Sequence, residues 1–274
     1  TANQSGDNGG ERTALFDQLN LGSSGLMNTS CDVMSAKDEM AALHMGVFLP
    51  WIQINSWFGL LHPWYFPDKE KAMYRDYIQL RHDLFPYIYS AALNGHLTGM
   101  PILRSMPLVY PDDRNVDDMV FQYMFGDNIL VAPILNDEGI AEYYVPEGKW
   151  TDIITGKVLE GGKWYKHKCS YFEIPALAKP NSIIAYGNFE RQIEYDYLEG
   201  TTFTIYELED GKSAVCPIYD TEANKVFELT ATRHGNKIEC EYTDTKASFK
   251  IAVANTDKTV EIAPNFSGKV IIEL

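Results

Sequence analysis

The first third of the chain alternates helical patterns with short apolar runs. Leu15, Phe16 and Leu19 recur at helical spacing within residues 11–20, and Gly22 offers a stop. A second helical pattern covers residues 36–46. The apolar runs that follow these two patterns both end in polar residues, which is the order of β/α units in a parallel barrel.

The longest helical pattern covers residues 68–94. Its apolar positions recur every three or four residues: Tyr77, Leu80, Leu84, Ile88 and Ala91. Pro86 lies inside this pattern and lacks a backbone N–H, so we expect a kink there.

Beyond Pro101 the pattern changes to strands of about five to eight residues, separated by turn signals such as EDGK and RHGNK. No helix-length period returns. The sequence therefore predicts an α/β part followed by an all-β part, with two β-sandwiches joined near residues 181–191.

Size and charge narrow the possible partners. The chain has 274 residues, of which 45% are hydrophobic and 13% aromatic, so we expect more than one folded unit. Its formal charge of −15 repels phosphate backbones and anionic lipid headgroups, which argues against a nucleic acid or a membrane as partner. The polar start TANQSGDNGG is no signal peptide, although a signal could lie upstream if the chain is part of a longer protein. The compartment, cytoplasmic or secreted, stays open.

Cysteines and histidines give no metal or cofactor signal. The cysteines form no C-x-x-C pair, and buried free thiols are the simplest interpretation: Cys31, Cys169, Cys216 and Cys240. The six histidines show no ligand spacing, and no glycine-rich phosphate loop opens a strand-to-helix unit. We expect neither a metal nor a cofactor.

Polar residues mark three successive strand ends of the expected β/α units. They are Asp7, then Asn28 with Asp32, then Gln53 with Asn55. In a (β/α) barrel, residues at the carboxyl ends of different strands converge on one pocket. Taken alone, an aspartate in a Gly/Asn turn such as Asp7 is most often a cap on the helix that follows it.

Three tryptophans follow these strand ends closely, namely Trp51, Trp57 and Trp64. Indole rings are suited to wall a sugar-binding pocket, although packing in a core is an equally good interpretation of each.

The order of motifs resembles the C-terminal part of a family 31 glycoside hydrolase. The motifs are SGDN, CDV, PW, the stretches at residues 81–104 and 122–133, and YYVPEGKW before the all-β tail. The resemblance covers nearly the whole chain, and the tail from Pro175 is most similar to α-xylosidase-like members.

The resemblance implies a fold and a domain order. Residues 1–96 would supply the last strands and helices of a (β/α)8 catalytic barrel, residues 97–184 a proximal β-sandwich and residues 185–274 a distal β-sandwich. A barrel cannot close without its earlier strands, so we expect this chain to be a portion of a longer enzyme. Its partners would be the N-terminal part of the same enzyme and an oligosaccharide or glycoside substrate.

The resemblance also implies chemistry. In the family, the aspartate of the SGDN-type motif is the general acid/base of a retaining, exo-acting α-glycosidase, and Asp7 occupies that place. Retaining enzymes need two carboxyls about 5 to 5.5 Å apart, one as nucleophile and one as acid/base. The family's nucleophile lies on an earlier strand, upstream of this chain.

The positions at which this sequence departs from the family pattern bear on which sugar the enzyme would bind. Gln4 replaces a usual tryptophan, Asp32 matches the family's aspartate, and Gln53 with Asn55 replace an Arg-x-His that holds sugar hydroxyls. Two neutral amides remove charge-assisted hydrogen bonds, so a sugar other than glucose or xylose is expected, such as an α-N-acetylgalactosaminide. We therefore expect Asn28, Asp32, Gln53, Asn55, Trp51 and Trp57 to contact the substrate.

Two alternatives remain at this stage. The all-β tail alone is consistent with a non-catalytic carbohydrate-binding or structural module. The same pocket could also run an α-transglycosylation, in which a sugar hydroxyl replaces water in attacking the covalent intermediate.

Overall fold

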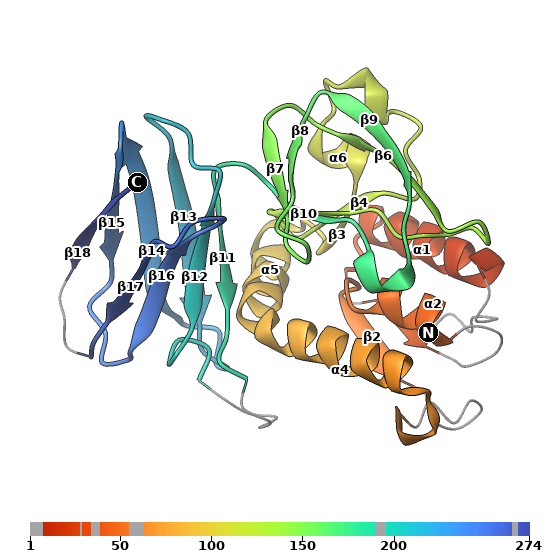
Figure 1. Cartoon of the computed structure of the whole chain (residues 1–274), viewed down its shortest axis with the longest axis horizontal. Coiled ribbons are helices and arrows are strands. Elements are labelled where there is room, and N and C mark those ends of the chain that lie inside the picture. Colours follow the sequence, from red (N-terminus) through yellow and green to blue (C-terminus); the bar gives the residue numbers. More distant parts are fainter. Residues whose placement is uncertain (1–7, 28, 34–38, 55–62, 190–195, 265–267) are drawn as a thin grey trace.

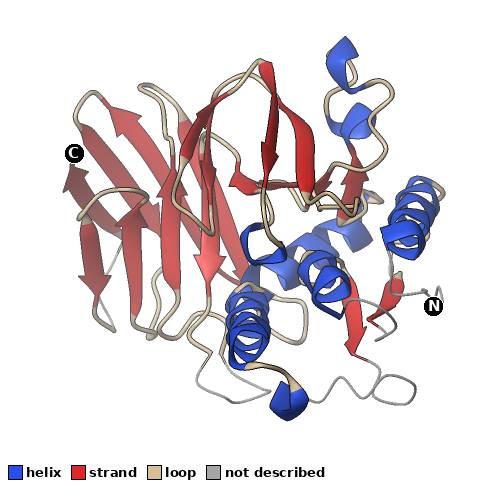
Figure 2. Cartoon of the chain, turned by 45° about the vertical axis from the view of Figure 1, so that its right-hand side comes forward, coloured by secondary structure: helices blue, strands red, loops and turns tan. Residues whose placement is uncertain are grey.

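The computed structural model describes residues 8–27, 29–33, 39–54, 63–189, 196–264 and 268–274. Figure 1 shows α1 (Asn8–Ser23), α2 (Glu39–Gly46) and β2 (Trp51–Ile54) at one end of the molecule and a β-sandwich at the other. The helices α4 (Asp68–Asp83) and α5 (Phe85–Thr98) and a further sheet lie between them. Figure 2 shows the longer helices beside the sandwich and below the further sheet, and the helix at residues 85–98 contacts two strands of the sandwich, at residues 182–186 and 213–219. The fold class is thus the end of a TIM barrel followed by β-sheet domains, as the sequence predicts.

The barrel part consists of helices α1 (Asn8–Ser23) and α2 (Glu39–Gly46), with strands β1 (Ser30–Val33) and β2 (Trp51–Ile54). The two helices confirm the patterns at residues 11–20 and 36–46. The strands pair in parallel and occupy only the last part of each predicted apolar run.

The long helical pattern forms two helices, α4 (Asp68–Asp83) and α5 (Phe85–Thr98). The break falls at Leu84, and Pro86 lies in the first turn of α5. A proline is tolerated there because the first-turn N–H groups have no intrahelical partner. The expected kink is therefore a break between two helices.

A six-stranded sheet follows the helices, in the order β3-β4-β5-β10-β7-β8. Its strands are β3 (Leu103–Ser105), β4 (Tyr123–Phe125), β5 (Ile129–Val131), β10 (Ala176–Ala178), β7 (Lys149–Asp152) and β8 (Val158–Glu160). A two-stranded antiparallel ribbon of β6 (Ile140–Val145) and β9 (Lys163–Lys168) lies beside it. The short helix α6 (Met106–Val109) and the 3₁₀ turns at Pro63–Tyr65, Arg114–Val116 and Tyr171–Glu173 complete this part.

The middle strands of the six-stranded sheet, β4, β5 and β10, are buried on both faces. In β5, Ile129 and Val131 pack in the core shared with α1, α2, α4 and α5, whereas Leu130 packs in a second core with the β6–β9 ribbon. This alternation follows from the two-residue period of a strand. It explains why the sequence here is a continuous apolar run, ILVAPIL, rather than an alternating pattern.

The distal part is a sandwich of two four-stranded sheets around one core. One sheet contains β11 (Ser182–Tyr186), β12 (Thr202–Tyr206), β16 (Phe249–Val253) and β17 (Thr259–Ile262). The other contains β13 (Ser213–Tyr219), β14 (Lys225–His234), β15 (Lys237–Tyr242) and β18 (Lys269–Glu273). β11 spans the predicted boundary between residues 184 and 185, and it pairs along its whole length with β12.

Cys216 and Cys240 are buried free thiols, and Cys169 is free and half-buried. The side chain of Cys31 lies outside the described residues. Among the helices that the structure describes, none has the length and apolar character needed to cross a membrane.

Tyr87 joins helix α5 to the six-stranded sheet. Its hydroxyl donates to the Phe125 carbonyl (2.6 Å) and accepts from the Asn128 backbone N–H (2.9 Å). Gly126 lies between these two partners with φ +64°, and a Cβ there would meet the Tyr87 hydroxyl at 2.5 Å. The close approach of the Tyr87 hydroxyl and the positive φ of residue 126 therefore both require glycine at this position.

We expect Gly126→Ala to destabilise the protein by about 1 to 3 kcal/mol more than Gly99→Ala. Gly99 also has a positive φ (+79°), but a Cβ there meets nothing within 4 Å, so its substitution reports the backbone cost alone. Urea unfolding of both variants measures the difference. Equal losses would contradict a tight contact at Tyr87.

Candidate active site

The strand pair β1–β2 defines the candidate active site. Its parallel register pairs Asp32 with Gln53 and Val33 with Ile54. Parallel strands end at the same edge of a sheet, so the carboxyl ends of β1 and β2 lie together. The backbone thus brings two of the predicted site residues, Asp32 and Gln53, opposite one another.

A βαβ connection produces this geometry. Helix α2 connects β1 to β2 and contacts both β1 and α4. After it the chain makes a fully buried turn, in which Val47, Phe48 and Leu49 are 0% exposed. Burying this apolar turn fixes where β2 begins, because the turn cannot shift without exposing these side chains.

Arg81 on α4 clamps that turn. Its Nη1 donates to the carbonyls of Val47 (2.7 Å) and Leu49 (2.8 Å), and its Nη2 donates to the carbonyl of Pro50 (3.1 Å). Arg81 itself is only 6% exposed. The planar guanidinium holds three carbonyl groups at once, in the four residues that lead into β2.

Burial lowers the pKa of Arg81 to about 10, which is still well above neutral. The guanidinium is therefore charged, and its hydrogen bonds to the carbonyls are charge-assisted. The sequence showed Arg81 only as a polar position in a helical pattern. A buried arginine with carbonyl partners has no local sequence signal, because its partners lie more than 30 residues away.

The β-sheet part supports the same turn from the other side. The Tyr123 hydroxyl donates to the Phe48 carbonyl (2.9 Å), and the Nε2 atom of buried His44 accepts from the Ile134 N–H (3.0 Å). His44 also packs against Tyr171, with ring centroids 4.7 Å apart. This histidine is thus a core residue whose ring nitrogen has a hydrogen-bond partner.

The structure does not describe several of the other predicted site residues in full. Asp7, Asn28, Asn55 and Trp57 lie outside the described residues. For Asp32 and Gln53 the backbone is described and the side chains are not.

The aromatic candidates near the strand pair are exposed. Trp51 opens β2, opposite Ser30, and is 64% exposed. Trp64 is 65% exposed and packs against Tyr65 with ring centroids 6.1 Å apart. Neither indole is a core residue within the described part of the chain, so packing does not account for them.

Comparison with protein families identifies the family to which the chain belongs. Residues 5–91 match the glycosyl hydrolases family 31 TIM-barrel domain, and residues 99–184 match the family 31 C-terminal domain. Residues 196–274 match the C-terminal domain of alpha-xylosidase YicI. The chain belongs to glycosyl hydrolase family 31, and it corresponds to the end of the barrel followed by the C-terminal domains.

Individual relatives agree with this assignment. Alpha-xylosidase XylQ of Lactiplantibacillus pentosus is 33% identical over 205 residues, covering 73% of this chain and 27% of that protein. Alpha-glucosidase 2 of Bacillus thermoamyloliquefaciens is 32% identical over 213 residues, covering 74% and 27%. The cycloalternan-forming enzyme of Listeria monocytogenes, solved with a pentasaccharide substrate, has the same fold (TM-score 0.83, 21% identity, 100% of this chain and 31% of that one). The chain spans about a quarter to a third of the length of these relatives.

We expect Arg81→Met to destabilise the protein by at least about 2 kcal/mol, because three carbonyls lose their charged donor. Arg75→Met, the same change on the same helix, is the control, since Arg75 is exposed and pairs only with its exposed neighbour Asp76 among the described contacts. We expect it to change stability by less than about 0.5 kcal/mol. Thermal unfolding compares the two, and a similar effect of both variants would contradict the clamp.

Proposed function

We propose that this chain forms the acid/base side of the active site in a retaining, exo-acting α-glycoside hydrolase that releases a terminal α-linked sugar. Asp7 is the acid/base, and the carboxylate nucleophile comes from an earlier strand of the same barrel. The N-terminal part of the same enzyme is therefore the first partner of this chain.

The register of β1 and β2 carries the proposal. Asp32 and Gln53 are paired at the carboxyl ends of parallel strands, within the residues that match the family's barrel domain. In barrel enzymes this edge is the one that binds substrate. The SGDN motif adds Asp7, which directly precedes α1 in the sequence. Relatives named alpha-xylosidase and alpha-glucosidase support an α-glycosidic bond as the bond cleaved.

The reaction proceeds in two steps. Asp7 donates its proton to the glycosidic oxygen while the upstream carboxylate attacks the anomeric carbon, so that the sugar–oxygen bond breaks and a covalent glycosyl-enzyme forms. Asp7, now a carboxylate, then takes a proton from water, and the resulting nucleophile displaces the enzyme carboxylate. Two inversions leave the released sugar in the α configuration.

The sugar is held by Asp32, Asn28, Gln53 and Asn55, with Trp51 and Trp57 against its apolar faces. Asp32 accepts hydrogen bonds from sugar hydroxyls, whereas each neutral amide both donates and accepts. The two amides suit a sugar substituent that both donates and accepts hydrogen bonds, such as an N-acetyl group. We therefore propose a sugar other than glucose or xylose, with an α-N-acetylgalactosaminide as the leading candidate.

In the complete enzyme, we expect Asp7→Ala to lower kcat/KM for a natural disaccharide by about 100-fold or more, because general acid catalysis contributes about that much. Hydrolysis of an aryl glycoside with an activated leaving group should fall far less. Added azide should restore turnover of that substrate, with a glycosyl azide as the product. Steady-state kinetics on both substrates measure this. Unchanged turnover of the disaccharide in the variant would contradict the role of Asp7.

Specificity is tested with a panel of aryl α-glycosides on the unaltered complete enzyme. We expect the N-acetylgalactosaminide to give a kcat/KM at least about 100-fold above the glucoside and the xyloside, because a site built for hydrogen bonds discriminates strongly. A preference for the glucoside or the xyloside would contradict the assignment of Gln53 and Asn55, while leaving the role of Asp7 intact.

A further inference from the structure

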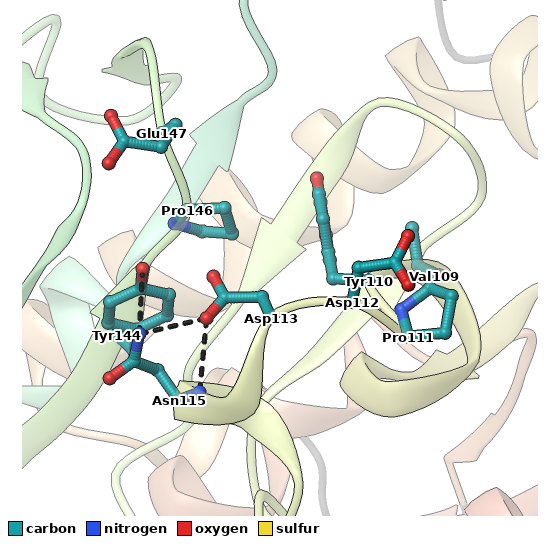
Figure 3. Close-up of a pocket in the computed structure, with 9 residues that line it drawn as sticks. All are labelled: Val109, Tyr110, Pro111, Asp112, Asp113, Asn115, Tyr144, Pro146 and Glu147. Atoms are coloured by element: carbon teal, nitrogen blue, oxygen red, sulfur yellow. Dashed lines mark hydrogen bonds between the residues drawn. The ribbon is translucent and has the colours of Figure 1, made fainter.

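A pocket separate from the candidate active site lies on the opposite face of the six-stranded sheet from helices α4 and α5. It has a volume of about 550 Å³ and is formed by two segments, residues 109–115 and residues 144–147. Figure 3 shows Asp113 with the ring of Tyr110 on one side and Tyr144 on the other. Tyr144 belongs to the core between the sheet and the β6–β9 ribbon, so the sheet separates this pocket from the helices that support β2.

The polar groups of the pocket hold one another in place. The Asp113 carboxylate accepts from the backbone N–H of Asn115 (3.0 Å) and from its side-chain amide (2.8 Å). The same amide donates to the Tyr144 hydroxyl (3.3 Å), as the dashed lines in Figure 3 show. Burial acts to raise the pKa of Asp113, but the hydrogen bonds from Asn115 and Tyr144 outweigh it and lower that pKa. At neutral pH the pocket thus presents a fixed carboxylate with remaining acceptor capacity.

An exposed indole extends this site. Trp164 on β9 is the register partner of Tyr144 on β6, and their ring centroids lie 5.8 Å apart. Tyr144 is only 3% exposed, whereas Trp164 is 52% exposed. The neighbouring pair on the same ribbon face, Glu142 and Lys166, is joined by an ion pair of 2.6 Å. The indole therefore stands beside fixed polar groups instead of being packed in a core.

Charge and composition select the ligand class. Asp112, Asp113 and Glu147 line the pocket, and the chain carries a net charge of −15, so phosphorylated and other anionic ligands are repelled. Among the described residues, no group of three or more His, Cys, Asp or Glu side chains is arranged to hold a metal ion. The pocket offers a fixed acceptor, an amide oxygen and a neighbouring aromatic face, which together suit a neutral molecule with many hydroxyl groups and an apolar ring face.

We propose that this pocket, with Trp164, is a binding site for a neutral oligosaccharide, separate from the candidate active site. One pyranose ring lies on the Trp164 indole, and its neighbour donates hydroxyl hydrogen bonds to the Asp113 carboxylate and to the side-chain carbonyl oxygen of Asn115, whose amide hydrogens are already engaged. The site retains the chain of a longer saccharide at the enzyme without taking part in bond cleavage.

Isothermal titration calorimetry tests the proposal on the complete enzyme, with maltotriose, isomaltotriose and xylotriose as probes and Asp7→Ala as background to slow their turnover. We expect at least one probe to bind, Trp164→Ala to weaken that binding by about tenfold, and Asn115→Ala by about fivefold. Both variants should keep kcat for a small aryl glycoside. An unchanged kcat shows that the loss of saccharide binding does not come from damage to the proposed catalytic site, so the two proposals can fail independently.

The control is Tyr219→Ala, which alters a groove of about 430 Å³ on the distal sandwich. It should leave saccharide binding unchanged. The proposal is overturned if no probe binds, if neither Trp164→Ala nor Asn115→Ala weakens binding, or if Tyr219→Ala alone does so. Displacement of a bound probe by a lysine-rich peptide at low salt, with an affinity above that of the saccharide, would assign the pocket to a cationic partner instead.

Discussion

The guanidinium of Arg81 holds three backbone carbonyls in the turn before β2, and the geometry of the candidate active site follows from that clamp. The turn fixes the first residue of β2, so it also fixes the register in which Gln53 faces Asp32. A shift of one residue would exchange the two faces of the strand. From the β-sheet side, the Tyr123 hydroxyl holds the same turn at Phe48, and the Ile134 N–H holds the preceding helix α2 at His44. The strand pair thus depends on contacts made far along the chain, in α4 and in the sheet that follows.

The six-stranded sheet has a structural role toward both of its faces. One face shares a core with the helices that follow the barrel strands, and the other face packs against the β6–β9 ribbon. Because its middle strands are buried on both faces, the sheet is a rigid support between two sites: the edge of β1 and β2, and the pocket at Asp113 with Trp164.

The sequence predicted those elements whose patterns are local. The helices α1, α2, α4 and α5 follow from apolar spacing and from Pro86, and most distal strands follow from their turn signals. It missed β9, because KWYKHK is largely exposed on a two-stranded ribbon and has no buried face to reveal it. β13, which contains Pro217, was also not predicted; it is at the edge of its sheet, where a missing backbone N–H is tolerated. The roles of Arg81 and Asn115 depend on partners distant in sequence or on turn geometry, so no period could indicate them.

The central claim is that a terminal α-linked sugar binds at the carboxyl ends of β1 and β2 with Asp7 aimed at its glycosidic oxygen. A crystal structure of the complete enzyme carrying Asp7→Ala, with an uncleaved α-glycoside, measures this directly. The account predicts that hydroxyls of the terminal sugar contact the side chains of Asp32 and Gln53, with the glycosidic oxygen facing the Cβ of residue 7. A sugar bound without contact to either strand end, or with residue 7 turned away from that oxygen, would contradict it.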